Sequence, residues 1–271
     1  MKFESGDLRI DYETHGSGLP IVFLHGLAVD RRMLVETFEP VFTTAGATQL
    51  DYQRIYLDLP GHGASPAALG YASADGLTDA IRQLIAELVG DRDLAIVGYS
   101  YGGYLAPLTA LHFSSVRGLF MVCPVAEPDF AKRRVAPRRV STRDPGLRFS
   151  DDPREQLAFD EIAVVQTQAV LAAFQRLIHP ANVDASQTML AAVRDRYVTM
   201  RPIVSLLQTY LRPATIVAGR DDHWVGFEDV LPWVRAMSRG SLHVLPDCGH
   251  LLPLEEPGRL RALFGEWLGS L

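Results

Sequence analysis

Cysteine is scarce in this chain of 271 residues, which has only Cys123 and Cys248. Two cysteines do not make a disulfide framework, so we expect free, buried thiols in a reducing compartment. Long apolar runs are also missing, since none approaches the roughly 20 residues that span a bilayer. The first residues, MKFESGDLRIDYE, are charged and lack the apolar segment of a signal peptide. These absences predict a soluble cytoplasmic protein with no membrane partner.

Excess positive charge is absent as well, because the formal net charge is −6. A general nucleic-acid binder would need a basic face, so that class is disfavoured. The glycine-rich turns are not followed by Gly-Lys-Ser/Thr, which excludes a phosphate loop. No spacing of histidine, cysteine and aspartate is typical of a metal site. We therefore expect a small-molecule substrate, no cofactor, no metal and no nucleic acid, and the sequence predicts nothing about oligomeric state.

Short apolar runs alternate with amphipathic segments along most of the chain. The runs predict strands over 19–24, 54–59, 94–97, 116–122, 214–219 and 241–245. The segments between them predict helices over about 31–45, 73–89, 101–113, 228–239 and 255–269. The first 16 residues alternate and turn at Ser5-Gly6-Asp7, which predicts an antiparallel hairpin. This order indicates an α/β fold with a mostly parallel sheet and right-handed crossovers.

The alternation breaks after Pro124, and residues 126–212 contain no convincing strand. Helical patterns near 153–178, 184–199 and 202–211 predict a helical cap inserted into a core formed by 1–125 and 213–271. The insertion begins with a basic, proline-bearing stretch, 132–143. We interpret that stretch as a solvated linker, and the alternative is that one of its arginines faces the active site and pairs with a substrate carboxylate.

A serine stands between the strand at 94–97 and the helix that follows it. The sequence Gly98-Tyr99-Ser100-Tyr101-Gly102 matches G-x-S-x-G, a sharp strand-to-helix turn with a serine at its apex. The glycines are expected where neighbouring chain passes too close for a Cβ. An ordinary Gly/Ser turn would give the same pattern, so the rest of the chain must decide.

A nucleophilic serine needs a base, and the base needs an acid to orient it. In an open parallel sheet such groups gather just past the carboxyl ends of strands. His250 follows the last predicted strand, and Asp221 and Asp222 follow the strand at 214–219. Asp247 is a third candidate acid, but it precedes His250 by only three residues in the same loop. The order along the chain is serine, aspartate, histidine.

These pieces together resemble the α/β-hydrolase superfamily, in its capped branch of serine esterases and C–C bond hydrolases. The resemblance covers nearly the whole chain and rests on FLHG at 23–26, DLPGHGAS at 58–65, GYSYGG at 98–103, GRDD at 219–222 and GH at 249–250. It implies an eight-stranded, mostly parallel sheet with helices on both faces and a helical cap.

The resemblance also implies roles for individual residues. The acid of this family is usually the last residue of a G-x-x-D motif, which selects Asp222 over Asp221. The backbone N–H groups of Leu27 and Tyr101 are implied to form the oxyanion hole. We expect His25 to orient its loop, and we place it with Tyr99 and Trp224 in the substrate pocket.

The remaining histidines are expected to have no catalytic part. His62 resembles a turn histidine of the family with its hydrogen bonds satisfied, and His223 is expected to be solvated. Structural or surface positions are expected for His15, His112, His179 and His243.

We therefore predict a carboxylesterase-like serine hydrolase that cleaves a small or medium ester through Ser100, His250 and Asp222 by way of an acyl-enzyme. The nearest alternative is a C–C bond hydrolase of vinylogous keto acids, of the meta-cleavage-product type. Those enzymes often carry Asn after the first glycine of the turn, and this chain has Tyr99. Lactonase and cofactor-free peroxidase-like activities stay open. From another class, the alternative is a ligand receptor that retains the hydrolase fold, which multiple-turnover assays would distinguish.

Overall fold

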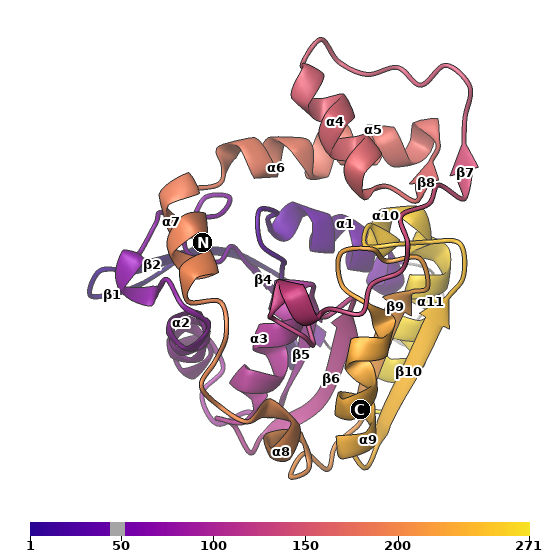
Figure 1. Ribbon diagram of the computed structural model, residues 1–271. Coiled ribbons are helices and arrows are strands. Elements are labelled where there is room, and N and C mark those ends of the chain that lie inside the picture. The colour runs from indigo at the N-terminus through magenta and orange to yellow at the C-terminus, as the bar shows by residue number, and fades with distance from the viewer. Residues whose placement is uncertain (44–51) are drawn as a thin grey trace.

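The computed structural model describes residues 1–43 and 52–271, and its centre is one sheet of eight strands in the order β1-β2-β4-β3-β5-β6-β9-β10 (Figure 1). Its strands are β1 (Lys2–Ser5), β2 (Leu8–His15), β3 (Leu19–Leu24), β4 (Tyr52–Leu57), β5 (Leu94–Tyr99), β6 (Val116–Val122), β9 (Ala214–Gly219) and β10 (Gly240–Leu245). The N-terminal hairpin pairs antiparallel, and the strands from β4 to β10 pair in parallel. The expected mostly parallel, eight-stranded sheet is thus confirmed.

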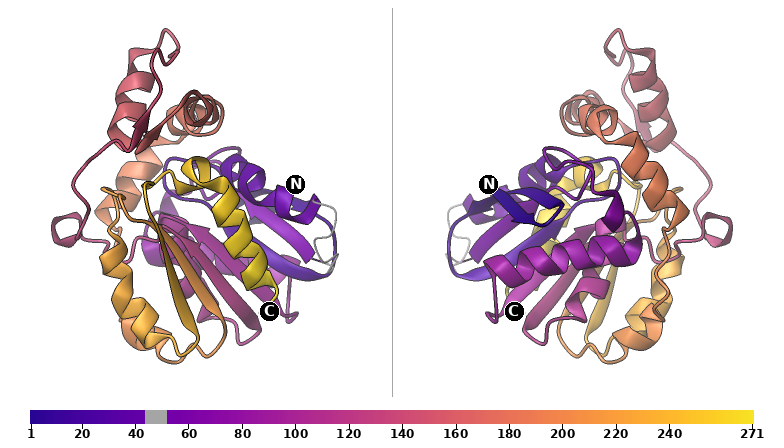
Figure 2. Two further views of the ribbon diagram at one scale, coloured as in Figure 1. Left: turned by 90° about the vertical axis from the view of Figure 1, so that its right-hand side faces the viewer. Right: turned by 90° about the vertical axis from the view of Figure 1, so that its left-hand side faces the viewer.

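Helices cover both faces of this sheet (Figure 2). On one face lie α1 (Arg31–Thr43) and α11 (Pro257–Leu268), where Phe38 and Phe264 pack with their rings 4.5 Å apart. On the other lie α2 (Ala74–Leu88), α3 (Tyr101–Ala110) and α9 (Leu231–Ala236), with η3 (Phe227–Val230) before α9. The central strands β3, β5, β6 and β9 are almost fully buried, which agrees with their apolar sequences. Within the described residues, no helix is long and apolar enough to cross a lipid bilayer.

Several element boundaries differ from those expected, and the helices expected over 101–113 and 228–239, for example, end at Ala110 and Ala236. The last two residues of the helix expected over 31–45 lie outside the described residues. The strand expected over 54–59 begins at Tyr52 and ends at Leu57, because Asp58 leaves the sheet to bind the first turn of α1. The last helix is divided into α10 (Leu252–Glu255) and α11, since Pro257 starts a new helix at its first position.

The insertion contains two strands that the sequence did not predict. Thr142–Arg143 forms β7 and Val165–Gln166 forms β8, and the two pair in parallel. Two residues are too few to give a periodic pattern, so this expectation of an entirely strand-free insertion was wrong. The helices are α4 (Pro153–Ile162), α5 (Gln168–Leu177), α6 (His179–Asp184), α7 (Gln187–Asp195) and α8 (Ile203–Leu207), and a short η2 (Phe130–Lys132) precedes them.

The helices of the insertion fall into two places (Figure 1). α4 to α7 lie together beyond one end of the sheet, where α5 contacts α10. α8 lies at the opposite end and packs against α3 and α9. The segment that carries α4–α7 therefore covers the end of the sheet at which the loops after β3, β5 and β9 emerge. The division into a core and a cap at residues 126 and 212 stays a prediction.

Candidate active site

The turn after β5 holds Ser100 in a strained conformation, with φ 53° and ψ −116°. A Cβ on Gly98 would lie 2.4 Å from the carbonyl oxygen of Gly102. A Cβ on Gly102 would lie 2.1 Å from the carbonyl oxygen of Leu24. Both glycines are thus required by close backbone approach, and Ser100 stands half-buried at the start of α3.

Ser100 belongs to a chain of three hydrogen-bonded side chains. Nε2 of His250 lies 2.9 Å from Oγ of Ser100, and Nδ1 lies 2.8 Å from Oδ2 of Asp222. The other carboxylate oxygen, Oδ1, accepts from the backbone N–H groups of Trp224 and Val225, each at 2.9 Å. An ionised carboxylate only accepts, so the proton of a neutral His250 lies on Nδ1 and Nε2 is free to accept from Ser100.

This arrangement can move a proton from Ser100 to His250. The Asp222 carboxylate is 1% exposed and next to His250, so it favours the imidazolium that forms after the transfer. Three residues that follow β5, β9 and β10 are thus hydrogen-bonded to one another at the carboxyl ends of parallel strands. Their catalytic roles stay a prediction.

The two other candidate acids have different partners. Arg139 binds both oxygens of Asp221, at 2.6 and 2.7 Å, and also Oδ1 of Asp247 at 2.7 Å. This ion pair fastens the start of the insertion to the loops after β9 and β10. Asp221 and Asp247 are engaged there, and the carboxylate beside His250 is Asp222.

The loop after β3 approaches Ser100 closely. A Cβ on Gly26 would lie 2.9 Å from Cβ of Ser100, and Leu27 lines the same cavity as Ser100. Tyr101 is the first residue of α3, a position whose N–H has no partner within a helix. Leu27 and Tyr101 are therefore on the loop and helix that flank Ser100, and their function as an oxyanion hole stays a prediction.

A cavity of about 220 Å³ opens in front of Ser100 and His250. Tyr99 and Trp224 line it, as expected, and the hydroxyl of Tyr99 donates to the backbone oxygen of His250 at 2.9 Å. The other lining residues are mostly apolar: Leu27, Ala28, Val29, Val125, Phe130, Arg133, Ile162, Ile178, Asn182, Arg194, Tyr197, Val225 and Leu251. Residues of the segment 126–212 thus add a few polar groups to an otherwise apolar wall.

His25 does not line this cavity, so its predicted place in the substrate pocket was wrong. The side chain is fully buried; Nδ1 donates to the carbonyl oxygen of Gly26 at 2.7 Å, and Nε2 accepts from the N–H of Leu59 at 2.8 Å. Both ring nitrogens are used to join the loops after β3 and β4. This is the loop-orienting position that the sequence also suggested.

Comparison with known proteins places this architecture in a family. A model of the alpha/beta hydrolase family matches residues 21–263. This chain belongs to the alpha/beta hydrolase family. The crystal structure of an alpha/beta superfamily hydrolase from Oenococcus oeni is similar to it with a TM-score of 0.89 and 28% identity, over 100% of this chain and 98% of that one.

Two further relatives show how far the likeness extends. An esterase from Thermogutta terrifontis has a TM-score of 0.73 at 24% identity, covering 97% of this chain and 93% of that one, which shows the fold alone. The 2-succinyl-6-hydroxy-2,4-cyclohexadiene-1-carboxylate synthase of Escherichia coli is 36% identical over 147 residues, 51% of this chain and 52% of that protein. The chain spans about half the length of the curated relatives it matches.

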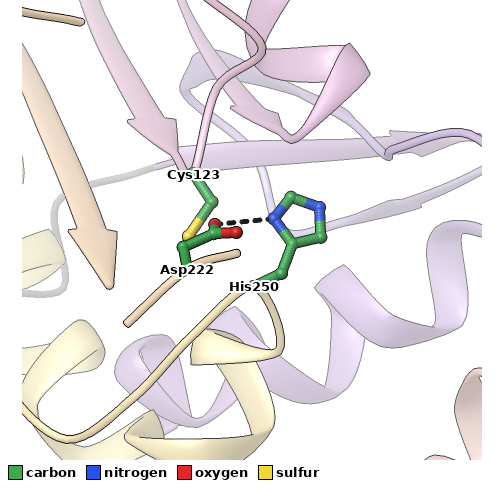
Figure 3. A group of neighbouring side chains, drawn as sticks. All are labelled: Cys123, Asp222 and His250. Carbon is green, nitrogen blue, oxygen red and sulfur yellow. Dashed lines mark hydrogen bonds and ion pairs between the residues drawn. The ribbon is translucent and has the colours of Figure 1, made fainter. Parts of the chain in front are cut away.

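Cys123 lies beside the site of this alpha/beta hydrolase, although no sequence motif marked it. Figure 3 shows its side chain next to Asp222 and His250, and the three ligand atoms are within 4.8 Å of one another. Burial raises the pKa of the Cys123 thiol well above its usual value. The thiolate is the form that binds metals, and Asp222 and His250 already bind each other, so the cluster favours proton transfer over metal binding.

Glu255 is a second buried residue that no sequence motif marked. Its carboxylate accepts from the N–H of Gly249 at 2.5 Å, and from Val164 and Val165 at 2.8 and 3.2 Å. Gly249 immediately precedes His250, whereas Val164 and Val165 belong to the insertion. Burial raises the pKa of Glu255, and the three N–H donors oppose that shift. The Glu255 carboxylate thus joins the loop that carries His250 to residues 164 and 165.

Replacing Glu255 by glutamine is expected to lower kcat by about 10–100-fold, because the His250 loop loses its anchor and small misplacements are costly. The amide has one oxygen for three donors and turns its own NH₂ toward them. Steady-state kinetics with an ester, together with urea unfolding, measures the effect. Glu256→Gln, a half-exposed neighbour, is the matched control, and equal kinetics for both variants would contradict the positioning role.

His62 departs from the expected satisfied turn histidine. Its Nδ1 lies 3.1 Å from the carbonyl oxygen of Pro60, but Nε2 is buried without a hydrogen-bond partner among the described residues. Its ring lies 5.1 Å from that of His25. Burial lowers the pKa of His62 to about 3 and that of His25 to about 4, so both are neutral in the folded protein near neutral pH.

Folding stability should therefore fall on mild acidification. The unfolded chain protonates both histidines below its ordinary pKa of 6.5, whereas the folded chain does so only below about 4 and about 3. Between its unfolded and folded pKa values, each histidine then lowers the free energy of unfolding by about 1.4 kcal/mol for every pH unit of acidification. Urea unfolding at pH 7.5 down to 4.5 measures the slope. His62→Gln should remove one histidine's share, and an unchanged slope would show that His62 is protonated in the folded state.

The basic stretch is mostly exposed, as expected of a solvated linker, but several of its side chains also have partners in the core. Arg134 binds Asp229 at 2.8 Å, and Arg139 binds Asp221 and Asp247, so these side chains fasten the stretch to the core. Arg133 lines the cavity in front of Ser100, which agrees with the alternative that one arginine faces the site. Both readings therefore hold in part, because most of the stretch is exposed and one of its arginines lines the cavity.

His223, expected to be solvated, binds the backbone oxygen of Glu161 at 2.7 Å.

Proposed function

We propose that this alpha/beta hydrolase is a serine carboxylesterase acting on a small or medium ester. The observation that carries the proposal is the continuous hydrogen-bonded chain from Asp222 through His250 to Ser100, which ends in a cavity. A serine hydroxyl with an oriented base at 2.9 Å has the contact that nucleophilic catalysis requires.

The steps follow from the contacts. His250 takes the proton of Ser100 as Oγ attacks the ester carbonyl, and Asp222 stabilises the imidazolium. The oxyanion would bind the N–H groups of Leu27 and Tyr101. His250 then returns the proton to the departing alcohol, and a water molecule, deprotonated by the same His250, releases the acid from Ser100. The size of the cavity, about 220 Å³, suits a small or medium substrate.

The experiment is hydrolysis of p-nitrophenyl esters of increasing acyl length, together with labelling by a fluorophosphonate probe. We expect multiple turnovers with an optimum at short or medium chains, and labelling at Ser100. Labelling without ester turnover would leave an active nucleophile but overturn esterase function. Stoichiometric binding with neither turnover nor labelling would favour a receptor.

A second candidate is the hydrolysis of a C–C bond in a vinylogous keto acid. The observation that favours it is Arg133 in the cavity wall, because such a substrate carries a carboxylate. The curated relative in Escherichia coli is named for a carboxylate compound, although the match covers 52% of that protein. Assaying a vinylogous keto acid alongside the esters separates the two candidates.

A further inference from the structure

The wall of the cavity is charged on one side only. Arg133 and Arg194 both line it, and among the described residues that form this wall no aspartate or glutamate occurs. Apart from Ser100, His250 and the two arginines, the lining consists of apolar side chains with Tyr99, Asn182, Tyr197 and Trp224. A cavity wall that carries cations and no carboxylate attracts an anion.

Arg133 has hydrogen bonds but no counter-ion in the described part of the chain. Its Nε donates to the backbone oxygen of Glu127 at 2.9 Å, and its Nη1 donates to that of Trp224 at 3.0 Å. The neighbouring Arg134 and Arg139, by contrast, each pair with carboxylates of the core. The two carbonyl bonds therefore fix the guanidinium in place and leave its charge uncompensated.

The remaining nitrogen, Nη2, is buried and has no hydrogen-bond partner among the described residues. The guanidinium lies over the ring of Phe130, 3.8 Å from its centre, which limits its movement. Burial raises the pKa of Tyr197 to about 12, whereas the charge of Arg133 and its side-chain contact with the Tyr197 hydroxyl lower that pKa. Tyr197 thus lies close to Arg133 on the same wall and offers a second donor. A buried donor without an acceptor is costly, so an acceptor of negative charge would be favoured there.

We propose that Arg133, with Tyr197 beside it and Arg194 on the same wall, is a carboxylate-binding subsite, and that the substrate is an ester carrying a free carboxylate. The inference rests on the proposed esterase function and narrows its substrate class. The carboxylate binds at the cap side while the ester carbonyl lies at Ser100. The mostly apolar wall between them accommodates the carbon chain that joins the two groups.

The kinetic test compares acidic esters with neutral esters of matched length. One set carries the carboxylate on the acyl side: mono-p-nitrophenyl succinate, glutarate and adipate against the butanoate, pentanoate and hexanoate. The other carries it on the alcohol side: acetyl esters of ω-hydroxy acids against simple alkyl acetates. We expect kcat/KM to favour the acidic member of at least one set by about 10–100-fold, the effect of one charged hydrogen bond.

The Arg133→Gln variant should remove that preference, so that the ratio of kcat/KM for the acidic ester to kcat/KM for its neutral partner falls by about 10–100-fold, whatever change the two esters share. Arg148→Gln is the matched control, since Arg148 is an exposed residue of the insertion that does not line the cavity. If Arg133→Gln loses activity equally on acidic and neutral esters, the role of Arg133 is structural. That result overturns the proposal. A wild-type protein with no preference in either set overturns it as well.

A binding experiment keeps this proposal separate from esterase function. In Ser100→Ala protein, calorimetry with monomethyl glutarate and dimethyl glutarate compares an acidic with a neutral ligand without turnover. We expect the acidic ligand to bind more tightly, and Arg133→Gln in the same background to abolish the difference. Tighter acid binding without ester hydrolysis by the wild type would overturn the esterase and retain the subsite. Ester hydrolysis without an acid preference in binding would do the reverse.

Discussion

Replacement of Ser100 by alanine is expected to reduce kcat on any accepted ester by about 10⁴-fold or more, with the fold intact. The Ser100 hydroxyl is the group that would bond to the substrate. Among the described residues that line the cavity, it is the hydroxyl that lies within hydrogen-bond distance of Nε2 of His250. Residual rate would come from substrate binding and the N–H groups near Leu27 and Tyr101. Single-turnover and steady-state assays with a p-nitrophenyl ester measure the loss.

The fold should survive this change because the strain at Ser100 lies in its backbone. Alanine has the same Cβ, so the contact between Gly26 and Cβ of residue 100 is unchanged. Circular dichroism and urea unfolding should match the wild type. Ser114→Ala, at an exposed loop position, controls for serine replacement in general. Activity within a few-fold of wild type would contradict a nucleophilic Ser100.

The core of this protein was predictable because its elements repeat a strong local signal. Runs such as 116–122 and 214–219 are rich in apolar residues, and the structure buries them almost completely as β6 and β9 with the expected bounds. The turn at Ser100 was predictable for a related reason. Glycine occurs where backbone approaches backbone, and a Cβ added to Gly98 or Gly102 would lie only 2.4 or 2.1 Å from a backbone oxygen.

The particular residues of 126–212 that line the cavity were not predictable, because tertiary packing alone brings them together. Arg133, Asn182 and Arg194 are far apart in the sequence and share no motif, yet all three line the cavity. Glu255 gave no signal either, since its role depends on three N–H groups from two distant segments. Under the proposed function, substrate preference would be set by residues in the part of the chain where local pattern is weakest.

Asp222→Asn is expected to lower kcat by about 10⁴-fold, almost as severely as the loss of Ser100. In the wild type Oδ1 accepts from Trp224 and Val225, and Oδ2 faces Nδ1 of His250. The single amide oxygen of asparagine would keep the two backbone donors, which turns its NH₂ toward His250. Nδ1 must then accept a hydrogen bond, so the proton of neutral His250 lies on Nε2. A protonated Nε2 can no longer take the proton of Ser100.

The matched variant is Asp221→Asn, one residue earlier in the same loop. It weakens the ion pair with Arg139, but Arg139 keeps Asp247, and Asp221 has no contact with His250 among the described residues. We expect its kcat within a few-fold of wild type, and fluorophosphonate labelling of Ser100 at nearly the wild-type rate, whereas Asp222→Asn should label far more slowly. Because both variants remove one carboxylate from the same loop, a general charge effect would slow them equally. A larger loss in Asp221→Asn would assign the orienting acid to Asp221 and contradict the proton path from Asp222 through His250 to Ser100.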